Sequence, residues 1–348
     1  MPSNDLTMDD IWQNDFSLLM EQLGDGNNIN SPEVGTTPKE LIYTENKLKL
    51  YRYLPLGVKQ KKTPLLITYA LVNRPYIVDL EPDRSLVLRL LEHGHPIYLI
   101  DWGYPDSSDC FTNLNDYING LMHRCVQHTK RNANTQKVNL LGICQGGVFS
   151  LCYAALKPKQ IRQLITLVTP VDFHSESNLL SLWANGIQHT ALTNNAGNIP
   201  SHLISQLFKT LKPFQLNREK YRQLSHVVSK KRHLDTFLRM EKWLSDGPDL
   251  AGAAASEFME SFYQNNGLLN NQLFIGKEKV LLEKINCPVL NLYATKDHIV
   301  PPTSAQALRK HIKPSLYTKH LLHGGHIGAF TSLKTQRDLI NTLNTWLK

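Results

Sequence analysis

The stretch at residues 138–147, Val-Asn-Leu-Leu-Gly-Ile-Cys-Gln-Gly-Gly, constrains the fold of this chain more than any other. Its apolar first half is typical of a buried strand, and an apolar helix is predicted directly after it, at 148–156. A Gly-x-Cys-x-Gly turn between a strand and a helix is the nucleophile-elbow pattern, with cysteine in place of the usual serine. The alternative is a buried structural cysteine beside a glycine turn. The strand before Cys144 and the helix after it favour a nucleophile.

Such a turn has physical properties that suit a reactive thiol. Only hydrogen side chains at Gly142 and Gly146 let neighbouring backbone pass close to a strained nucleophile. The helix that follows points its N-terminus at the sulfur of Cys144, which favours the thiolate over the thiol. We therefore expect close backbone contacts at both glycines.

Strands and helices alternate on both sides of this turn. Strands are predicted at 41–43, 48–53, 64–70, 96–102, 138–143, 164–168, 288–294 and 316–322. Helices are predicted at 85–93, 113–129, 148–156, 303–312 and 333–347. Ser85 is a suitable N-cap for the first of these helices, and Gly94 follows its end. The alternation predicts an α/β protein with a mostly parallel sheet and helices on both faces. Together with the elbow it indicates the α/β-hydrolase fold.

The alternation of strands and helices stops between residues 172 and 284, where the sequence contains no convincing buried strand. Amphipathic helices are predicted there at 203–211, 236–244 and 253–263. We interpret 172–284 as a helical cap inserted into a core made of 36–171 and 285–348; the alternative is ordinary helices of one continuous domain. Residues 1–35 form an N-terminal arm with helical spacing at 8–23, which either packs on a partner or frays.

Composition places the chain among ordinary globular proteins, with 41% hydrophobic and 20% charged residues. No apolar run approaches the roughly 20 residues that a membrane span needs. The polar, acidic N-terminus is unlike a signal peptide, and five scattered cysteines fit a reduced, cytoplasmic setting. The net charge of +8 suits a phosphate-bearing substrate, and we find no nucleic-acid-binding motif.

A cysteine nucleophile needs an acid and a base, which follow it in this order along such a chain. Asp297 comes just after the strand predicted at 288–294, at the edge of the sheet where the acid that supports the base would lie. A turn or N-cap aspartate is the alternative. His326 follows the last strand in a glycine-rich loop, His-Gly-Gly-His-Ile-Gly, and is the better candidate for the base. His323 is its rival, although a structural role is the more common one for such a histidine.

A metal site is the other interpretation of this histidine-rich segment. His320, His323 and His326 recur every three residues, but glycines lie between the last two, and no cysteine or carboxylate nearby completes a tetrahedral set. We therefore expect no metal. An oxyanion hole needs two backbone N–H donors, and we expect them at Gln145, after the nucleophile, and at Val72, in the loop after an early strand. The alternative for that loop is a simple connection made rigid by a proline.

Six motifs carry a resemblance to a known family. They lie at 71–80 (Leu-Val-Asn-Arg-Pro-Tyr-Ile-Val-Asp-Leu), 98–103 (Tyr-Leu-Ile-Asp-Trp-Gly), 142–147 (Gly-Ile-Cys-Gln-Gly-Gly), 197–200 (Gly-Asn-Ile-Pro), 296–298 (Lys-Asp-His) and 325–328 (Gly-His-Ile-Gly). From about residue 34 onward the chain resembles the polyhydroxyalkanoate synthases, and among them the short catalytic subunit of the two-subunit type. The resemblance implies a Cys144–His326–Asp297 triad under a helical cap.

The resemblance also implies what such a chain does and where. The implied substrates are (R)-3-hydroxyacyl-CoA thioesters, with 3-hydroxybutyryl-CoA as the expected one, and the implied reaction polymerises them into polyester with release of CoA and without a cofactor. The implied partners are a second, non-catalytic subunit and a homodimer or larger assembly, in the cytoplasm at the surface of polyester granules. Two rivals stay open: a thioesterase or dienelactone-hydrolase-like cysteine hydrolase, and a non-catalytic granule-associated protein.

Overall fold

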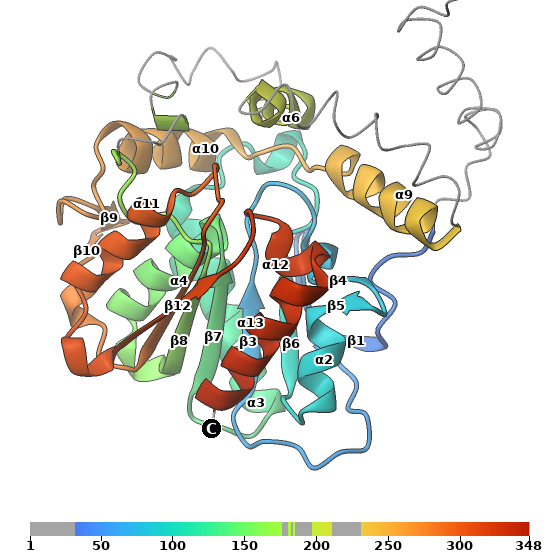
Figure 1. The fold of residues 1–348 in the computed structure, drawn as a ribbon. Helices are drawn as coiled ribbons and strands as arrows, with labels where there is room; N and C mark the ends of the chain where they lie inside the picture. Colours follow the sequence, from blue (N-terminus) through green and yellow to red (C-terminus); the bar gives the residue numbers. More distant parts are fainter. Residues whose placement is uncertain (1–31, 176–179, 182–183, 185–196, 211–230, 348) are drawn as a thin grey trace, which may run out of the picture.

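The computed structural model describes residues 32–175, 180–181, 184, 197–210 and 231–347 (Figure 1). The helix expected at 8–23 lies outside these residues. Eight strands form one sheet in the order β1-β2-β6-β3-β7-β8-β11-β12. Their bounds are Lys39–Glu45 (β1), Leu48–Tyr53 (β2), Leu65–Thr68 (β3), Ile97–Asp101 (β6), Val138–Ile143 (β7), Ile161–Leu167 (β8), Val289–Ala294 (β11) and Tyr317–Leu322 (β12). Strand β2 is antiparallel to both of its neighbours, β1 and β6, and all other neighbouring pairs are parallel, so the expected mostly parallel sheet is confirmed.

Strand β7 lies in the middle of this sheet. It pairs in parallel with β3 and β8, and Gly142 is opposite Thr68 on one side and Thr166 on the other. All six of its residues are buried, because a parallel strand flanked on both sides is covered by helices on both faces. The strand that ends at the cysteine is therefore held on both sides before the turn begins.

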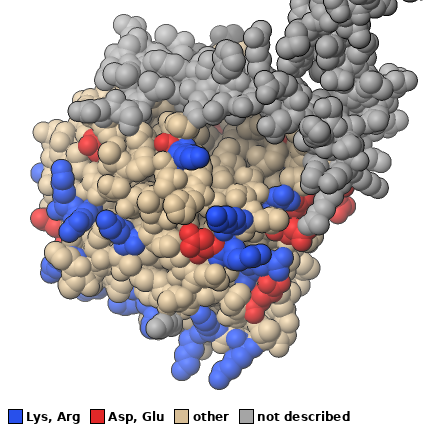
Figure 2. Space-filling view, viewed as in Figure 1, with Lys and Arg blue, Asp and Glu red and all other residues tan. Residues whose placement is uncertain are grey.

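The predicted cap helices lie over the end of the sheet that carries this turn (Figure 1). They are α6 (Ser201–Thr210), α9 (Lys231–Ser245) and α10 (Gly252–Phe258). The boundaries of the cap and the core stay predictions. Every described helix is too short or too polar to cross a membrane. In Figure 2, Lys and Arg side chains are scattered over one face of the molecule with Asp and Glu among them, and they form no continuous stripe there.

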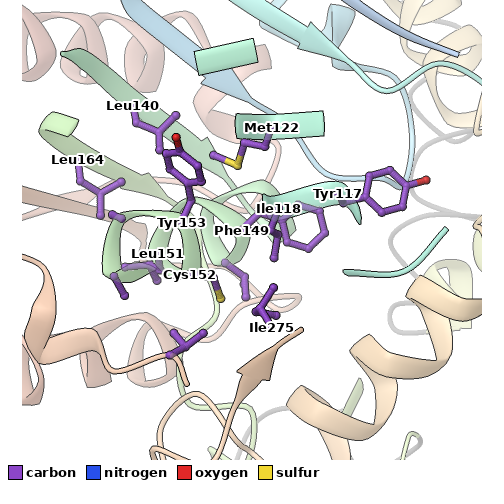
Figure 3. Packing of buried hydrophobic residues seen from close by; sticks show 14 of the residues in the cluster. Tyr117, Ile118, Met122, Leu140, Phe149, Leu151, Cys152, Tyr153, Leu164 and Ile275 are labelled. Atoms are coloured by element: carbon purple, nitrogen blue, oxygen red, sulfur yellow. The ribbon is translucent and has the colours of Figure 1, made fainter. Parts of the chain in front are cut away.

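Two hydrophobic clusters lie on the two faces of the sheet, because successive residues of a strand point to opposite sides. Leu140 belongs to the first cluster and Leu141 to the second. The first surrounds the buried helix α4 (Gln145–Leu156), whose Phe149 and Tyr153 are shown in Figure 3. The second contains side chains of α2 (Leu86–Glu92) and α13 (Leu333–Trp346). The Ser85 hydroxyl accepts a hydrogen bond from the Leu88 amide, which confirms the predicted N-cap.

Several elements differ from the expectation. The helix predicted at 113–129 starts as a π-helix, η3 (Asp116–Met122), before α3 (His123–Asn132), and α10 is followed by a second π-helix, η7 (Met259–Gln264). The helix predicted at 303–312 divides into α11 (Pro302–Gln306) and a 3-10 turn, η9 (Ala307–Lys310). Apolar spacing over seven residues cannot distinguish these helix types from an α-helix. The remaining short helices are η1 (Pro75–Val78), η2 (Ser107–Asp109), η4 (Pro158–Gln160), η8 (Leu282–Lys284), η10 (Pro314–Leu316) and α12 (Gly328–Thr331).

The region between 172 and 284, where no convincing buried strand was expected, contains a small hairpin. It consists of β9 (Phe274–Ile275) and β10 (Glu278–Lys279), joined by a turn at Gly276, whose φ is 60°. A second hairpin, β4 (Asp79–Glu81) with β5 (Arg84–Ser85), was also not predicted. Strands of two or three residues are too short to show an alternating pattern.

Candidate active site

Cys144 occupies the turn between β7 and α4, and its backbone has φ 53° and ψ −123°. A positive φ is unfavourable for a residue with a side chain, so the surrounding contacts must hold it. The Cys144 amide donates to the Leu167 carbonyl (2.9 Å), and the Cys144 carbonyl accepts from the Gly147 amide (2.9 Å). The side chain is partly exposed. This is the strained strand-to-helix turn that the sequence predicts.

The glycines around the turn are required by close contacts. A Cβ at Gly146 would lie 2.3 Å from the Thr68 carbonyl oxygen, and one at Gly142 would lie 2.5 Å from the Gly147 Cα. Gly147 is equally restricted, since its Cβ would lie 1.8 Å from the Thr169 hydroxyl. The close contacts at Gly142 and Gly146 were expected. The contact at Gly147 was not, because it involves Thr169 in the loop after β8, outside the motif.

Asp297 lies in the loop after β11, with a side chain that is completely buried. Its Oδ1 accepts hydrogen bonds from the backbone amides of Ile299 (3.0 Å) and Val300 (2.8 Å). Its Oδ2 accepts from Nδ1 of His326 at 2.7 Å. The carboxylate thus caps its own turn and also holds the imidazole by a hydrogen bond. Its role as the acid of a triad stays a prediction.

His326 lies between β12 and α12, and its side chain is 14% exposed. The side chain of Cys144 is close enough to interact electrostatically with the same ring. Burial lowers the pKa of His326, but the Asp297 carboxylate and the Cys144 sulfur raise it by more, so the pKa lies well above that of an ordinary histidine. The structure therefore brings Cys144, His326 and Asp297 together in one line.

The other histidines of this segment have different surroundings. His320 lies on β12 with Nε2 3.1 Å from the carboxylate of Asp338. The His323 carbonyl accepts from the Thr335 hydroxyl at 2.6 Å. Across the described ranges, no three His, Cys, Asp or Glu side chains gather at a spacing that would hold a metal ion.

The loop after β3 approaches the elbow from the other side. The Leu71 amide donates to Oε1 of Gln145 at 2.9 Å, so the first side chain of α4 connects the loop to the turn. The Gln145 amide is the first N–H of α4 and has no acceptor within the helix. Val72 and Cys144 pack against the same hydrophobic cluster. The assignment of Val72 and Gln145 as oxyanion donors stays a prediction.

Two aromatic side chains near the sulfur were not anticipated. Burial, together with the Cys144 sulfur, raises the pKa of both Tyr69 and Tyr263. Tyr69 follows β3, whereas Tyr263 comes from the π-helix η7, with its ring centroid 5.0 Å from that of Phe173. Neither residue belongs to a motif, and only the fold brings them to the cysteine.

The sheet order and the strained turn after the central strand define an α/β-hydrolase fold with cysteine at the elbow. A family model described as "alpha/beta hydrolase fold" matches residues 64–333. Solved structures show the same fold at low sequence identity. An esterase from Thermogutta terrifontis has a TM-score of 0.53 at 15% identity, covering 89% of this chain and 97% of the other. The non-heme bromoperoxidase BpoC of Mycobacterium tuberculosis has a TM-score of 0.53 at 9% identity, covering 88% and 98%.

More similar relatives define the family. A model described as "Poly-beta-hydroxybutyrate polymerase (PhaC) N-terminus" matches residues 4–90. The poly(3-hydroxyalkanoate) polymerase subunit PhaC of Allochromatium vinosum is 46% identical over 322 residues, which is 92% of this chain and 91% of the relative. That of Thiocystis violacea is 45% identical over 321 residues, which is 92% and 90%. The chain belongs to this family of polymerase subunits, and the resemblance found in the sequence is confirmed.

Proposed function

We propose that Cys144, His326 and Asp297 are the catalytic triad of this poly(3-hydroxyalkanoate) polymerase subunit and that it polymerises (R)-3-hydroxyacyl-CoA, with 3-hydroxybutyryl-CoA as the expected substrate. The observation that carries the proposal is the line from the Cys144 sulfur through the His326 imidazole to the buried Asp297 carboxylate. Because His326 lies between these two side chains, it can take a proton from Cys144 while Asp297 stabilises its positive charge.

The first half of the reaction loads the enzyme. The thiol proton of Cys144 passes to His326, and the thiolate attacks the carbonyl carbon of the acyl-CoA. The backbone amides of Gln145 and Val72 are the donors we assign to the oxyanion that forms. The carbon–sulfur bond to CoA then breaks, and His326 returns the proton to the departing CoA thiolate. The acyl group is left as a thioester on Cys144.

The second half extends the polymer. His326 accepts the proton of a 3-hydroxyl group, from a monomer or a chain end, and the resulting oxygen attacks the acyl-enzyme. A new ester forms as the carbon–sulfur bond to Cys144 breaks, and His326 returns the proton to the Cys144 sulfur. Asp297 either orients His326 only or also helps to deprotonate the hydroxyl. Transfer of the acyl group from a thioester to a hydroxyl is favourable in free energy. A serine enzyme would instead hold the acyl group as an oxoester, with nearly the same free energy as the ester bond of the product. This difference accounts for a cysteine at the elbow.

The helical cap and the charge of the chain have roles in this scheme. Water competes with the hydroxyl for the acyl-enzyme, so a cover over the site favours polymer over free acid. The net charge of +8 helps to attract the phosphates of CoA. No cofactor is required. We further propose a second, non-catalytic subunit, assembly as a homodimer or larger complex, and action at granule surfaces in the cytoplasm.

The test is incubation of the purified chain with 3-hydroxybutyryl-CoA, with and without the candidate second subunit. CoA release is followed with a thiol reagent, and polymer by turbidity and chain-length analysis. Release of CoA together with high-mass polyester is the expected result. Release of CoA with free 3-hydroxybutyrate would instead support a thioesterase, and no release at all would favour a non-catalytic protein. We expect weak activity from the chain alone, and full activity without the second subunit would contradict that expectation.

A further inference from the structure

One face of the cap helix α9 packs directly against the loop at residues 71–76. Met240, Trp243 and Leu244 of this helix belong to the same hydrophobic cluster as Val72 and Cys144. The three side chains are spaced as neighbours on one helical face. The cap is therefore in contact with the loop that carries the second oxyanion donor of the proposed mechanism.

Hydrogen bonds give this contact a defined geometry. The indole N–H of Trp243, whose side chain is almost fully buried, donates to the Arg74 carbonyl at 2.8 Å. Asp246, directly after α9, accepts from two phenols: Oδ2 from Tyr76 at 3.1 Å and Oδ1 from Tyr104 at 2.5 Å. Phenol–carboxylate bonds are charge-assisted and directional. Helix α9 thus holds the loop at two of its residues.

The opposite side of the loop is attached to the core. The Arg74 guanidinium donates to the Asp101 carboxylate at 2.7 Å and to the Gly103 carbonyl at 2.9 Å, at the end of β6. It also lies 4.1 Å from the ring centroid of Tyr104. Because Tyr104 contacts both Arg74 and Asp246, the attachment to the core and the attachment to the cap share one side chain. A loop held from both sides has little freedom left to move its amides.

We propose that Asp246 is a positioning residue that makes the oxyanion site complete only while α9 is docked. Through Tyr76 and Tyr104 it holds the 71–76 loop so that the Val72 amide faces the oxygen that develops beside Cys144. Movement of α9 away from the core breaks these bonds and releases the loop. The inference rests on the proposed function, because the loop positions the Val72 amide for the oxyanion of that reaction.

The test compares Asp246→Ala, Asp246→Asn and Tyr76→Phe with the matched control Asp235→Asn. Asp235 lies on the same helix, and its side chain makes no hydrogen bond or ion pair with another residue described in the structure. For CoA release we expect kcat to fall on the order of tenfold to a hundredfold in Asp246→Ala with KM nearly unchanged, because a displaced donor weakens only the transition state. Asp246→Asn retains one acceptor oxygen and should lose less. The control should match the wild type.

Amide hydrogen exchange of the 71–76 peptide provides the second measurement. Faster exchange in Asp246→Ala and Tyr76→Phe than in the wild type and the control is expected. Unchanged exchange, or a raised KM with unchanged kcat, would overturn the proposal. If the wild type releases no CoA, the proposed function fails, whereas the exchange data still decide whether Asp246 holds the loop. Should Asp246→Ala fail to fold, Asp246→Asn and Tyr76→Phe give the same comparison with smaller changes.

Discussion

The Nδ1 atom of His326 lies 2.7 Å from Oδ2 of Asp297, and the carboxylate that accepts this bond is completely buried. The other carboxylate oxygen is held by two backbone amides, so the acceptor cannot turn away from the ring. A bond at Nδ1 selects the ring orientation in which Nε2 is left for another partner. The electrostatic effect of Cys144 on the same ring is consistent with that orientation.

The raised pKa of His326 gives a pH-dependent prediction. Because folding raises this pKa above its unfolded value of about 6.5, the stabilisation is fully present below that pH and is lost as the pH rises through the folded pKa. Asp297→Asn removes the largest influence that raises the pKa of His326, so this pKa should fall below that of the wild type. The measurement is NMR titration of the His326 imidazole. Asp338→Asn, which alters the half-exposed pair with His320, is the control and should leave the pKa of His326 unchanged. An unaltered pKa in Asp297→Asn would contradict the electrostatic account.

The role of Cys144 can be tested separately from polymer formation. Cys144→Ala should lower CoA release by roughly four orders of magnitude or more, because the group that forms the covalent bond is lost. Mass spectrometry of the intact protein mixed with substrate should show an acyl adduct on the wild type and none on the variant. Cys110→Ala, which removes a partly exposed thiol elsewhere, is the control. An adduct on Cys144→Ala, or unchanged release, would refute the assignment of the nucleophile.

Part of this site is predictable because its physical requirements are local. Gly142 lies in the strand that ends at the elbow. Gly146, Asp297 and His326 each follow a recognisable strand, and parallel strands end at one edge of a sheet. The contact between Trp243 and Arg74 has no such signal, since it joins residues 169 positions apart. An amphipathic pattern shows that a helix buries one face but does not show which loop that face meets.

The close packing at Gly146 predicts a large loss of stability for Gly146→Ala. The new Cβ would meet two backbone carbonyl oxygens, of Thr68 at 2.3 Å and Tyr69 at 2.6 Å, which cannot rotate away as a side chain can. We expect the free energy of unfolding to fall by about 3 kcal/mol or more. Gly120→Ala is the control, because its Cβ would meet only the flexible Arg124 guanidinium, at 3.4 Å. Urea denaturation measures both, and equal stabilities of the two variants would contradict the contact.

A buried carboxylate connects the cap helix α9 to the loop of the base. Glu81, which is 7% exposed, pairs with Arg84 and with Arg239 of α9, the latter at 2.8 Å. It also accepts from the Thr236 hydroxyl of α9 at 2.9 Å. Arg84 Nε in turn donates at 2.8 Å to the carbonyl of Thr331, at the end of α12, the helix that follows His326. One acidic side chain therefore supports the cap, the β4–β5 hairpin and α12.

Glu81→Gln should accordingly destabilise the protein far more than the loss of one surface ion pair. Two largely buried guanidinium groups would keep their charges without a carboxylate, at a cost of roughly 3 kcal/mol in the free energy of unfolding. Glu92→Gln is the matched control, because the Arg89–Glu92 pair is exposed and should contribute less than about 1 kcal/mol. Thermal denaturation compares the stabilities, and limited proteolysis shows whether α9 is cut first. Equal losses in the two variants would mean that Glu81 does not support the cap.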